Sequence, residues 1–219
     1  GAIESGLFSI CSQATQWEIA SKFVYQLREA SNEERMNRGY ASLEVLTDIT
    51  EINRAAKKVN WRFAKGNRFA DFVSYFGGAE GEWSEEIRNA GVDERQKYVK
   101  RIKWLGKKTF SFWHICLGGT KLAAFDVHLL RGLKGFGFEI EENFFIPKSR
   151  KKGKQKVRKT PNRARYLEIE KQVLDFFGGD ERFVLEDGSV NAAFMDAVLW
   201  WRGAGRDKFQ GCFVGVGLS

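Results

Sequence analysis

Three pairs of adjacent glycines each follow an apolar segment whose hydrophobic residues recur at helical spacing. The pairs are Gly77-Gly78, Gly118-Gly119 and Gly178-Gly179. Glycine directly after the last apolar turn often ends a helix, because it readily adopts the left-handed backbone of many helix C-termini. The pairs therefore predict helices that end near Phe76, Leu117 and Phe177, and they indicate a mainly α fold.

Apolar spacing and capping residues predict further helices. One helical face is marked by Trp17, Ala20, Val24 and Leu27, and a second by Leu43, Leu46, Ile49 and Ala56. Expected helix starts are Asp93, the pair Thr160-Pro161, and Ser189, whose helix runs through Trp200. Only residues 138–146 and 183–185 have a strand-like pattern.

The length and hydropathy of the chain indicate a soluble globular protein. Its 219 residues can form one large domain or two small ones with a buried core. The hydrophobic share of 43% excludes a disordered chain. No apolar run approaches the roughly 20 residues that cross a bilayer, and no charged and apolar leader opens the sequence. We therefore expect a protein of the cytoplasm or nucleoid that does not associate with membranes.

The cysteines and histidines do not indicate a metal or a disulfide framework. The three cysteines are Cys11, Cys116 and Cys212, which lie far apart and are odd in number. No cluster of His, Cys and Asp has the spacing of metal ligands, and the glycines form no P-loop or dinucleotide motif. The expectation is a reducing compartment with no metal and no cofactor.

The positive charge is concentrated in one segment. The chain has a formal net charge of +8, and residues 148–165, here called the basic strip, contain ten Lys and Arg and no acid. Without the strip, 26 basic residues face 28 acidic ones. Such a run either contacts a polyanion such as DNA or is a solvated surface loop, and both interpretations remain open.

A very short turn at Gly106 joins two helices within residues 98–117. A tight hairpin of this kind exposes backbone N–H groups at the start of its second helix, where the helix dipole also favours a phosphate. Asp126 follows Lys108 by 18 residues and opens another predicted helix. Together these features predict a helix start that suits a phosphate, followed by a carboxylate at the start of another helix.

This arrangement resembles that of the helix-hairpin-helix DNA glycosylases, and most closely the 8-oxoguanine DNA glycosylase/lyases. In that family the hairpin ends in Gly-x-Lys, and Asp-Val-His follows after nearly the same interval; residues 106–108 and 126–128 hold those positions here. The segment KTFSF (108–112) is similar to the Lys-Thr-x-x-Phe of the archaeal 8-oxoguanine glycosylases. The segment MDAVLW (195–200) is similar to their Asp-x-x-x-Trp helix.

The resemblance implies a two-lobed helical fold. One lobe is expected to combine residues 1–40 with 136–219, and the other to span residues 41–135 and carry the hairpin at about residues 95–118. It also implies a monomer whose partner is double-stranded DNA containing a damaged base.

Lys108 and Asp126 are the candidate catalytic residues. A neutral lysine amine can attack C1′ of the deoxyribose and form a Schiff base that permits strand cleavage. The apolar neighbours of Lys108 in the sequence are expected to favour the neutral amine by excluding water. Asp126, near a helix start, can remain ionised and stabilise positive charge on the sugar.

The resemblance also implies roles for other residues. The pocket for a flipped base would be formed by Phe112, Phe125, Asp196 and Trp200. The DNA backbone would be bound by Gly106, Lys107, His128, Lys151, Lys152 and Arg158. Each of these residues has a plain structural interpretation as well: the aromatic rings can pack in a core, Asp126 can simply cap a helix, and the lysines can lie in solvent.

The function expected from the sequence is base-excision repair, in which the enzyme excises an oxidised purine, 8-oxoguanine, and cleaves the strand through a lysine Schiff base. Two alternatives remain open. The same fold can act on another damaged or modified base, or the chain can be a non-catalytic helix-hairpin-helix DNA-binding module.

The basic strip makes a testable prediction about salt. Each phosphate contact lowers the slope of log K against log salt by about 0.9 for duplex DNA. Replacing four strip residues, including Lys151, Lys152 and Arg158, with Gln should therefore flatten the slope measured by fluorescence anisotropy and weaken all duplex sequences alike. An unchanged slope would show that the strip does not bind DNA.

Overall fold

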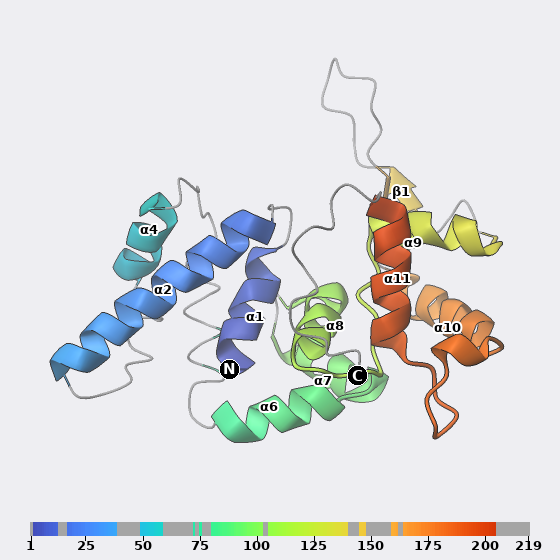
Figure 1. Ribbon diagram of the computed structural model, residues 1–219, viewed down its shortest axis with the longest axis horizontal. Coiled ribbons are helices and arrows are strands. Elements are labelled where there is room, and N and C mark those ends of the chain that lie inside the picture. The colour runs from blue at the N-terminus through green and yellow to red at the C-terminus, as the bar shows by residue number, and fades with distance from the viewer. Residues whose placement is uncertain are drawn as a thin grey trace, which may run out of the picture. The chain divides into compact units, whose positions relative to one another are not determined.

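The computed structural model describes residues 2–12, 17–38, 49–58, 72, 75, 80–102, 105–139, 145–147, 159–161 and 164–204. The chain divides into two compact units, residues 1–119 (unit 1) and residues 120–219 (unit 2). Both are built mainly from helices, so the predicted mainly α class is confirmed (Figure 1). No described helix is long and apolar enough to span a membrane.

The regular structure of unit 1 is helical in its described residues. Its helices are α1 (Ala2–Cys11), α2 (Trp17–Arg38), α4 (Ile49–Lys58), α6 (Glu80–Asn89), α7 (Val92–Arg101) and α8 (Lys107–Cys116). Helix α1 packs against α2, α6 and α8, while α2 also packs against α4. Helices α2, α4, α7 and α8 were predicted from the sequence, whereas α6 and α1, whose buried residues include Leu7 and Ile10, were not.

In its described residues, unit 2 combines three α-helices with a short antiparallel ribbon. Its elements are α9 (Val127–Leu133), η1 (Lys134–Phe136), β1 (Phe145–Pro147), β2 (Lys159–Pro161), α10 (Tyr166–Phe177), η3 (Glu181–Phe183) and α11 (Ala192–Ala204). In the ribbon Phe145 pairs with Pro161 and Pro147 with Lys159. The core lies between α9, α10 and α11, with Leu129, Leu133, Val173, Phe177, Met195 and Leu199 among its fully buried side chains.

Two glycines allow the backbones of α9 and α11 to approach closely. A Cβ placed on Gly132 would lie 2.0 Å from the carbonyl oxygen of Leu199, and one on Gly203 would lie 1.7 Å from that of His128. No side chain larger than hydrogen fits at either point without moving a helix. The glycines therefore set the separation of the two helices.

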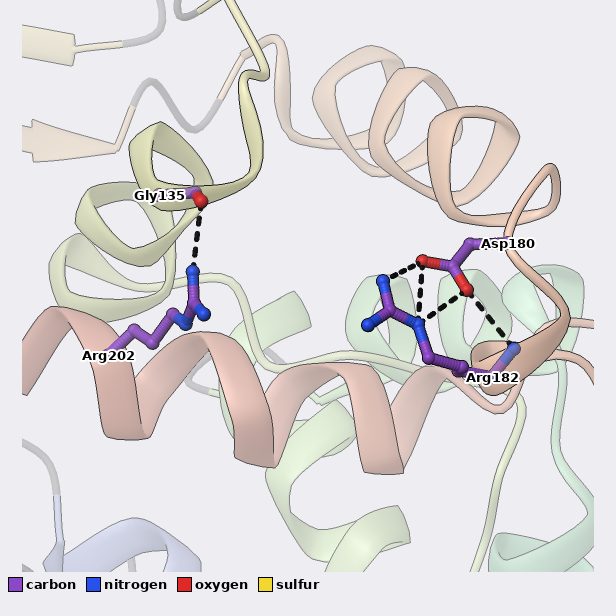
Figure 2. A network of polar contacts seen from close by, with 4 residues as sticks. All are labelled: Gly135, Asp180, Arg182 and Arg202. Atoms are coloured by element: carbon purple, nitrogen blue, oxygen red, sulfur yellow. Dashed lines mark hydrogen bonds and ion pairs between the residues drawn. The ribbon is translucent and has the colours of Figure 1, made fainter.

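Arg202 links α11 to the segment that follows α9 (Figure 2). Its guanidinium donates a hydrogen bond of 2.9 Å to the carbonyl of Gly135 and lies 4.4 Å from the ring centroid of Phe136.

Figure 2 also shows Asp180 accepting hydrogen bonds from Arg182 on η3. These bonds hold the pKa of the Asp180 carboxyl below its usual value.

Two predicted N-caps are corrected by the structure. Gly91, not Asp93, precedes α7, and its N–H donates to the carboxylate of Glu94 over 3.0 Å. Glu94 lies in the first turn of α7, so its carboxylate can accept the N–H of the capping residue Gly91. This bond is one of the two that make up a capping box. Helix α11 begins at Ala192 rather than directly after Ser189, and Asn191 accepts a hydrogen bond from the N–H of Phe194.

The predicted helix start at Thr160-Pro161 is wrong. Both residues lie in β2, and α10 begins at Tyr166. A proline fits the end of a strand as well as the first turn of a helix, because it lacks only an N–H that neither position requires. The predicted end of this helix at Phe177 is confirmed, with Gly178 as its C-cap.

The structure divides once, between Gly119 and Thr120. The expected lobes, residues 1–40 with 136–219 and residues 41–135, stay a prediction. In unit 1 the N-terminal helix α1 packs against α8, the second helix of the hairpin.

Replacing Gly203 with alanine should destabilise unit 2. The new methyl group would overlap the carbonyl of His128, and overpacking of this kind typically costs about 1–3 kcal/mol. Gly179→Ala is the control, because the nearest atom to its Cβ is 3.7 Å away; its effect should stay within about 0.5 kcal/mol. Equal free energies of unfolding in urea for the two variants would contradict the close approach.

Candidate functional site

The hairpin of unit 1 consists of α7 and α8, and the described residues between them are Ile102, Leu105 and Gly106. Helix α7 ends at Arg101, and the N–H of Leu105 donates to the carbonyl of Ile102 over 3.0 Å. Both Leu105 and Ile102 are buried and anchor the turn. Gly106 is exposed, with φ −80° and ψ 159°, and is the N-cap of α8. The first N–H groups of α8 thus follow a residue without a side chain.

Buried contacts hold the two hairpin helices together. Arg95 on α7 is fully buried and donates a 2.8 Å hydrogen bond to the hydroxyl of Ser111 on α8. The ring of Tyr98 stacks on Phe110, with 5.3 Å between centroids. Burial, followed by the hydrogen bond to Glu86, raises the pKa of Tyr98 above its usual range, so its hydroxyl remains a donor. The turn is therefore carried on a well-packed pair of helices.

Lys107 and Lys108 occupy the first turn of α8. The side chain of Lys107 is partly buried, whereas that of Lys108 is exposed. The apolar neighbours of Lys108 in the sequence were expected to exclude water from its side chain. Leu105 and Thr109 are buried, but Lys108 itself is exposed.

Asp126 is the N-cap of α9 in unit 2. One carboxylate oxygen, Oδ1, accepts hydrogen bonds from the backbone N–H of His128 at 2.8 Å and of Leu129 at 2.9 Å. The cap satisfies two N–H groups that have no partner inside the helix, and the helix dipole favours its negative charge. The predicted position at a helix start is confirmed.

Side chains from α10 and α11 hold the chain that leads to Asp126. The carboxylate of Asp196 accepts the N–H of Ala124. The hydroxyl of Tyr166 donates to the carbonyl of Ala123 at 3.0 Å and accepts the N–H of Phe125 at 3.1 Å. Asp196, predicted as a contact for a base, is thus bonded to backbone two residues before Asp126.

Three aromatic residues of the predicted site belong to unit 2. Phe125 and His128 lie within two residues of Asp126 in the sequence, and Trp200 lies on α11. His128 and the partly exposed Trp200 have ring centroids 5.6 Å apart, so α9 and α11 bring them together. Nδ1 of His128 is buried and has no hydrogen-bond partner among the described residues. The ring of Phe125 is 2% exposed and packs edge-on against Tyr166, which makes it a core residue.

The remaining predicted residues divide between the units or lie outside the description. Phe112, like Gly106, Lys107 and Lys108, belongs to unit 1, where its partly exposed ring lies 5.9 Å from that of Phe8. Lys151, Lys152 and Arg158 lie outside the described residues. The basic strip begins after β1, and its later part includes β2.

Tyr166 is the residue that sequence reasoning missed. Its partners lie 41 and 43 residues earlier in the chain, and no local pattern links a tyrosine in the first turn of α10 to them. Among the described residues, no group of His, Cys, Asp and Glu could hold a metal ion.

No protein-family model, curated protein or solved structure matches the chain. The function is therefore argued from the residues themselves.

Substitutions at Asp126 test its structural role as the cap of α9. Asp126→Ala removes the cap and should lower the free energy of unfolding by about 1 kcal/mol. Asp126→Asn should cost clearly less, because asparagine caps helices as well as aspartate does. Urea unfolding followed by circular dichroism measures both. If the Asp126→Ala protein were as stable as the wild type, the hydrogen bonds from His128 and Leu129 to Asp126 would not contribute to stability.

Proposed function

We propose that this protein is a DNA glycosylase with AP lyase activity, which removes an oxidised purine such as 8-oxoguanine from double-stranded DNA. The proposal is carried by one observation: the exposed Lys108 lies in the first turn of α8, directly after Gly106 and Lys107, and Asp126 is the helix-capping carboxylate that follows it in the chain. These are the two groups that the chemistry requires.

The hairpin binds the DNA backbone. The exposed Gly106 lets a phosphate approach the first N–H groups of α8, which has ten residues and a full dipole. Lys107 adds a positive charge beside this site, and His128 on α9 and the strip residues Lys151, Lys152 and Arg158 contact further phosphates. These contacts hold the DNA without reading its sequence.

Lys108 is the nucleophile. Its neutral amine forms a bond to C1′ while the glycosidic C–N bond breaks and the base leaves with a proton. Opening of the sugar ring gives an imine between the lysine and C1′. Loss of a proton from C2′ then expels the 3′ phosphate and cleaves the strand. Because Lys108 is exposed in the protein alone, the bound nucleotide must itself exclude water and favour the neutral amine.

Asp126 stabilises the positive charge that develops on the sugar as the base leaves. Its carboxylate is oriented by the hydrogen bonds to His128 and Leu129 before any substrate binds. A charge that is already in place costs no reorganisation during the reaction, which is how fixed groups lower such barriers.

The proposed contacts of the flipped base on α11 are the partly exposed ring of Trp200 and the carboxylate of Asp196. The partly exposed ring of Phe112 is the stacking candidate on α8. Asp196 is 9% exposed and already accepts one backbone N–H. A carboxylate can accept more than one hydrogen bond, so it can also accept an N–H of an oxidised purine.

The exposure of Lys108 also favours a second candidate, a non-catalytic DNA-binding module. In that case both lysines of the α8 first turn bind phosphate, and Asp126 only caps α9.

Borohydride trapping distinguishes the two candidates. The reductant should convert the imine into a stable bond and leave wild-type protein attached to a duplex that contains 8-oxoguanine. Lys108→Gln should abolish both the adduct and strand cleavage while duplex binding changes little, because glutamine has similar length but no nucleophilic amine. Gel electrophoresis measures all three results.

Lys107→Gln is the matched control. Its side chain points about 100° away around the helix, so this variant should bind DNA somewhat more weakly and still form the adduct. Trapping by Lys108→Gln at the wild-type level would refute the mechanism. The absence of adduct and cleavage with every lesion duplex would favour the binding module.

A further inference from the structure

Three consecutive residues before Asp126 have backbone groups bonded by side chains from other helices. These groups are the carbonyl of Ala123 and the N–H groups of Ala124 and Phe125. All three residues are buried, with exposed fractions of 0%, 5% and 2%. A buried backbone group that loses its partner is costly, so these bonds fix the path of the segment.

One hydroxyl makes two of the three bonds. Tyr166 is 5% exposed, and its oxygen is both donor to Ala123 and acceptor from Phe125, while its ring packs edge-on against Phe125 with 5.8 Å between centroids. The carboxylate of Asp196 on α11 makes the third bond, between the two. The chain is therefore held on both sides of Ala124 by α10 and at Ala124 by α11.

The segment has no regular structure of its own between Leu122 and Asp126. Asp126 follows Phe125 directly, so a shift of the Phe125 amide would move the carboxylate and its bonds to α9. A displacement of about 1 Å at a reacting group can cost roughly a hundredfold in rate.

We propose that Tyr166 is a positioning residue for Asp126, which acts through the backbone of residues 123–125 and is supported by Asp196. This inference rests on the proposed function for its catalytic consequence. Tyr166 does not itself touch the substrate; it holds the carboxylate where the charge on the sugar develops.

The test uses Tyr166→Phe, which removes only the hydroxyl oxygen. Amide hydrogen exchange at His128 and Leu129, measured by NMR, reports the bonds to Asp126 without any substrate. Their protection should fall while protection within α8 is unchanged. The single-turnover rate of base removal should fall roughly ten- to a hundredfold, while the Kd for lesion duplex changes less than threefold.

Tyr98→Phe is the matched control for lost stability. Tyr98 is buried to a similar degree, at 6%, and its hydroxyl bonds to Glu86 in unit 1. Once exchange is compared at equal global stability, this variant should leave His128 and Leu129 protected. An equal loss of protection in both tyrosine variants would overturn the proposal, as would wild-type protection and rate in Tyr166→Phe.

Two variants of Asp196 give an independent check. Asp196→Asn keeps an oxygen that can accept the N–H of Ala124, whereas Asp196→Ala removes it. Protection of the His128 and Leu129 amides from exchange should therefore be kept in Asp196→Asn and fall in Asp196→Ala. Equal protection in the two variants would show that Asp196 does not help to position Asp126. If wild-type protein removed no base from any duplex, the proposed function would fail, and hydrogen exchange alone would decide whether Tyr166 holds Asp126.

Discussion

The close contact between the backbones of α9 and α11 determines where the candidate residues of unit 2 lie. It exists because Gly132 and Gly203 have no side chains at the two points of nearest approach. The same pair of helices brings the ring of His128 to 5.6 Å from that of Trp200 and carries Asp126 and Asp196. A wider separation would weaken all of these relationships together.

Hydrogen bonds from polar side chains also hold the backbone at and before the start of α9. Asp126 satisfies the first N–H groups of α9, and Tyr166 and Asp196 satisfy the backbone just before it. Each bond links one of these side chains to a helix end or to a buried segment of the chain, so Asp126 and Asp196, which are proposed for function, also have structural roles. That coincidence explains why Asp126→Asn, which preserves the cap, separates the two roles better than Asp126→Ala.

Local signals predicted much of this structure, whereas distant contacts did not. The glycine pairs correctly predicted the ends of α8 and α10, since a helix stop depends on neighbouring residues only. The helix start predicted at Thr160-Pro161 was wrong because the same two residues also suit the end of a strand. The roles of Tyr166 and of Gly203 could not be predicted, because their partners lie tens of residues away in the chain. The exposure of Lys108 was missed because neighbours in the sequence such as Leu105 and Thr109 are buried while Lys108 is not.

The central claim is that the amine of Lys108 attacks the sugar and that Asp126 stabilises the charge that develops as the base leaves. A duplex with a preformed abasic site separates the two steps, because its sugar already lacks the base and can form the imine directly. Borohydride should therefore trap Asp126→Asn on the abasic duplex at the wild-type rate, whereas this variant should release 8-oxoguanine more slowly than the wild type in a single turnover. Lys108→Gln should lose the adduct with both duplexes. Wild-type base release by Asp126→Asn, or wild-type trapping by Lys108→Gln, would contradict the account.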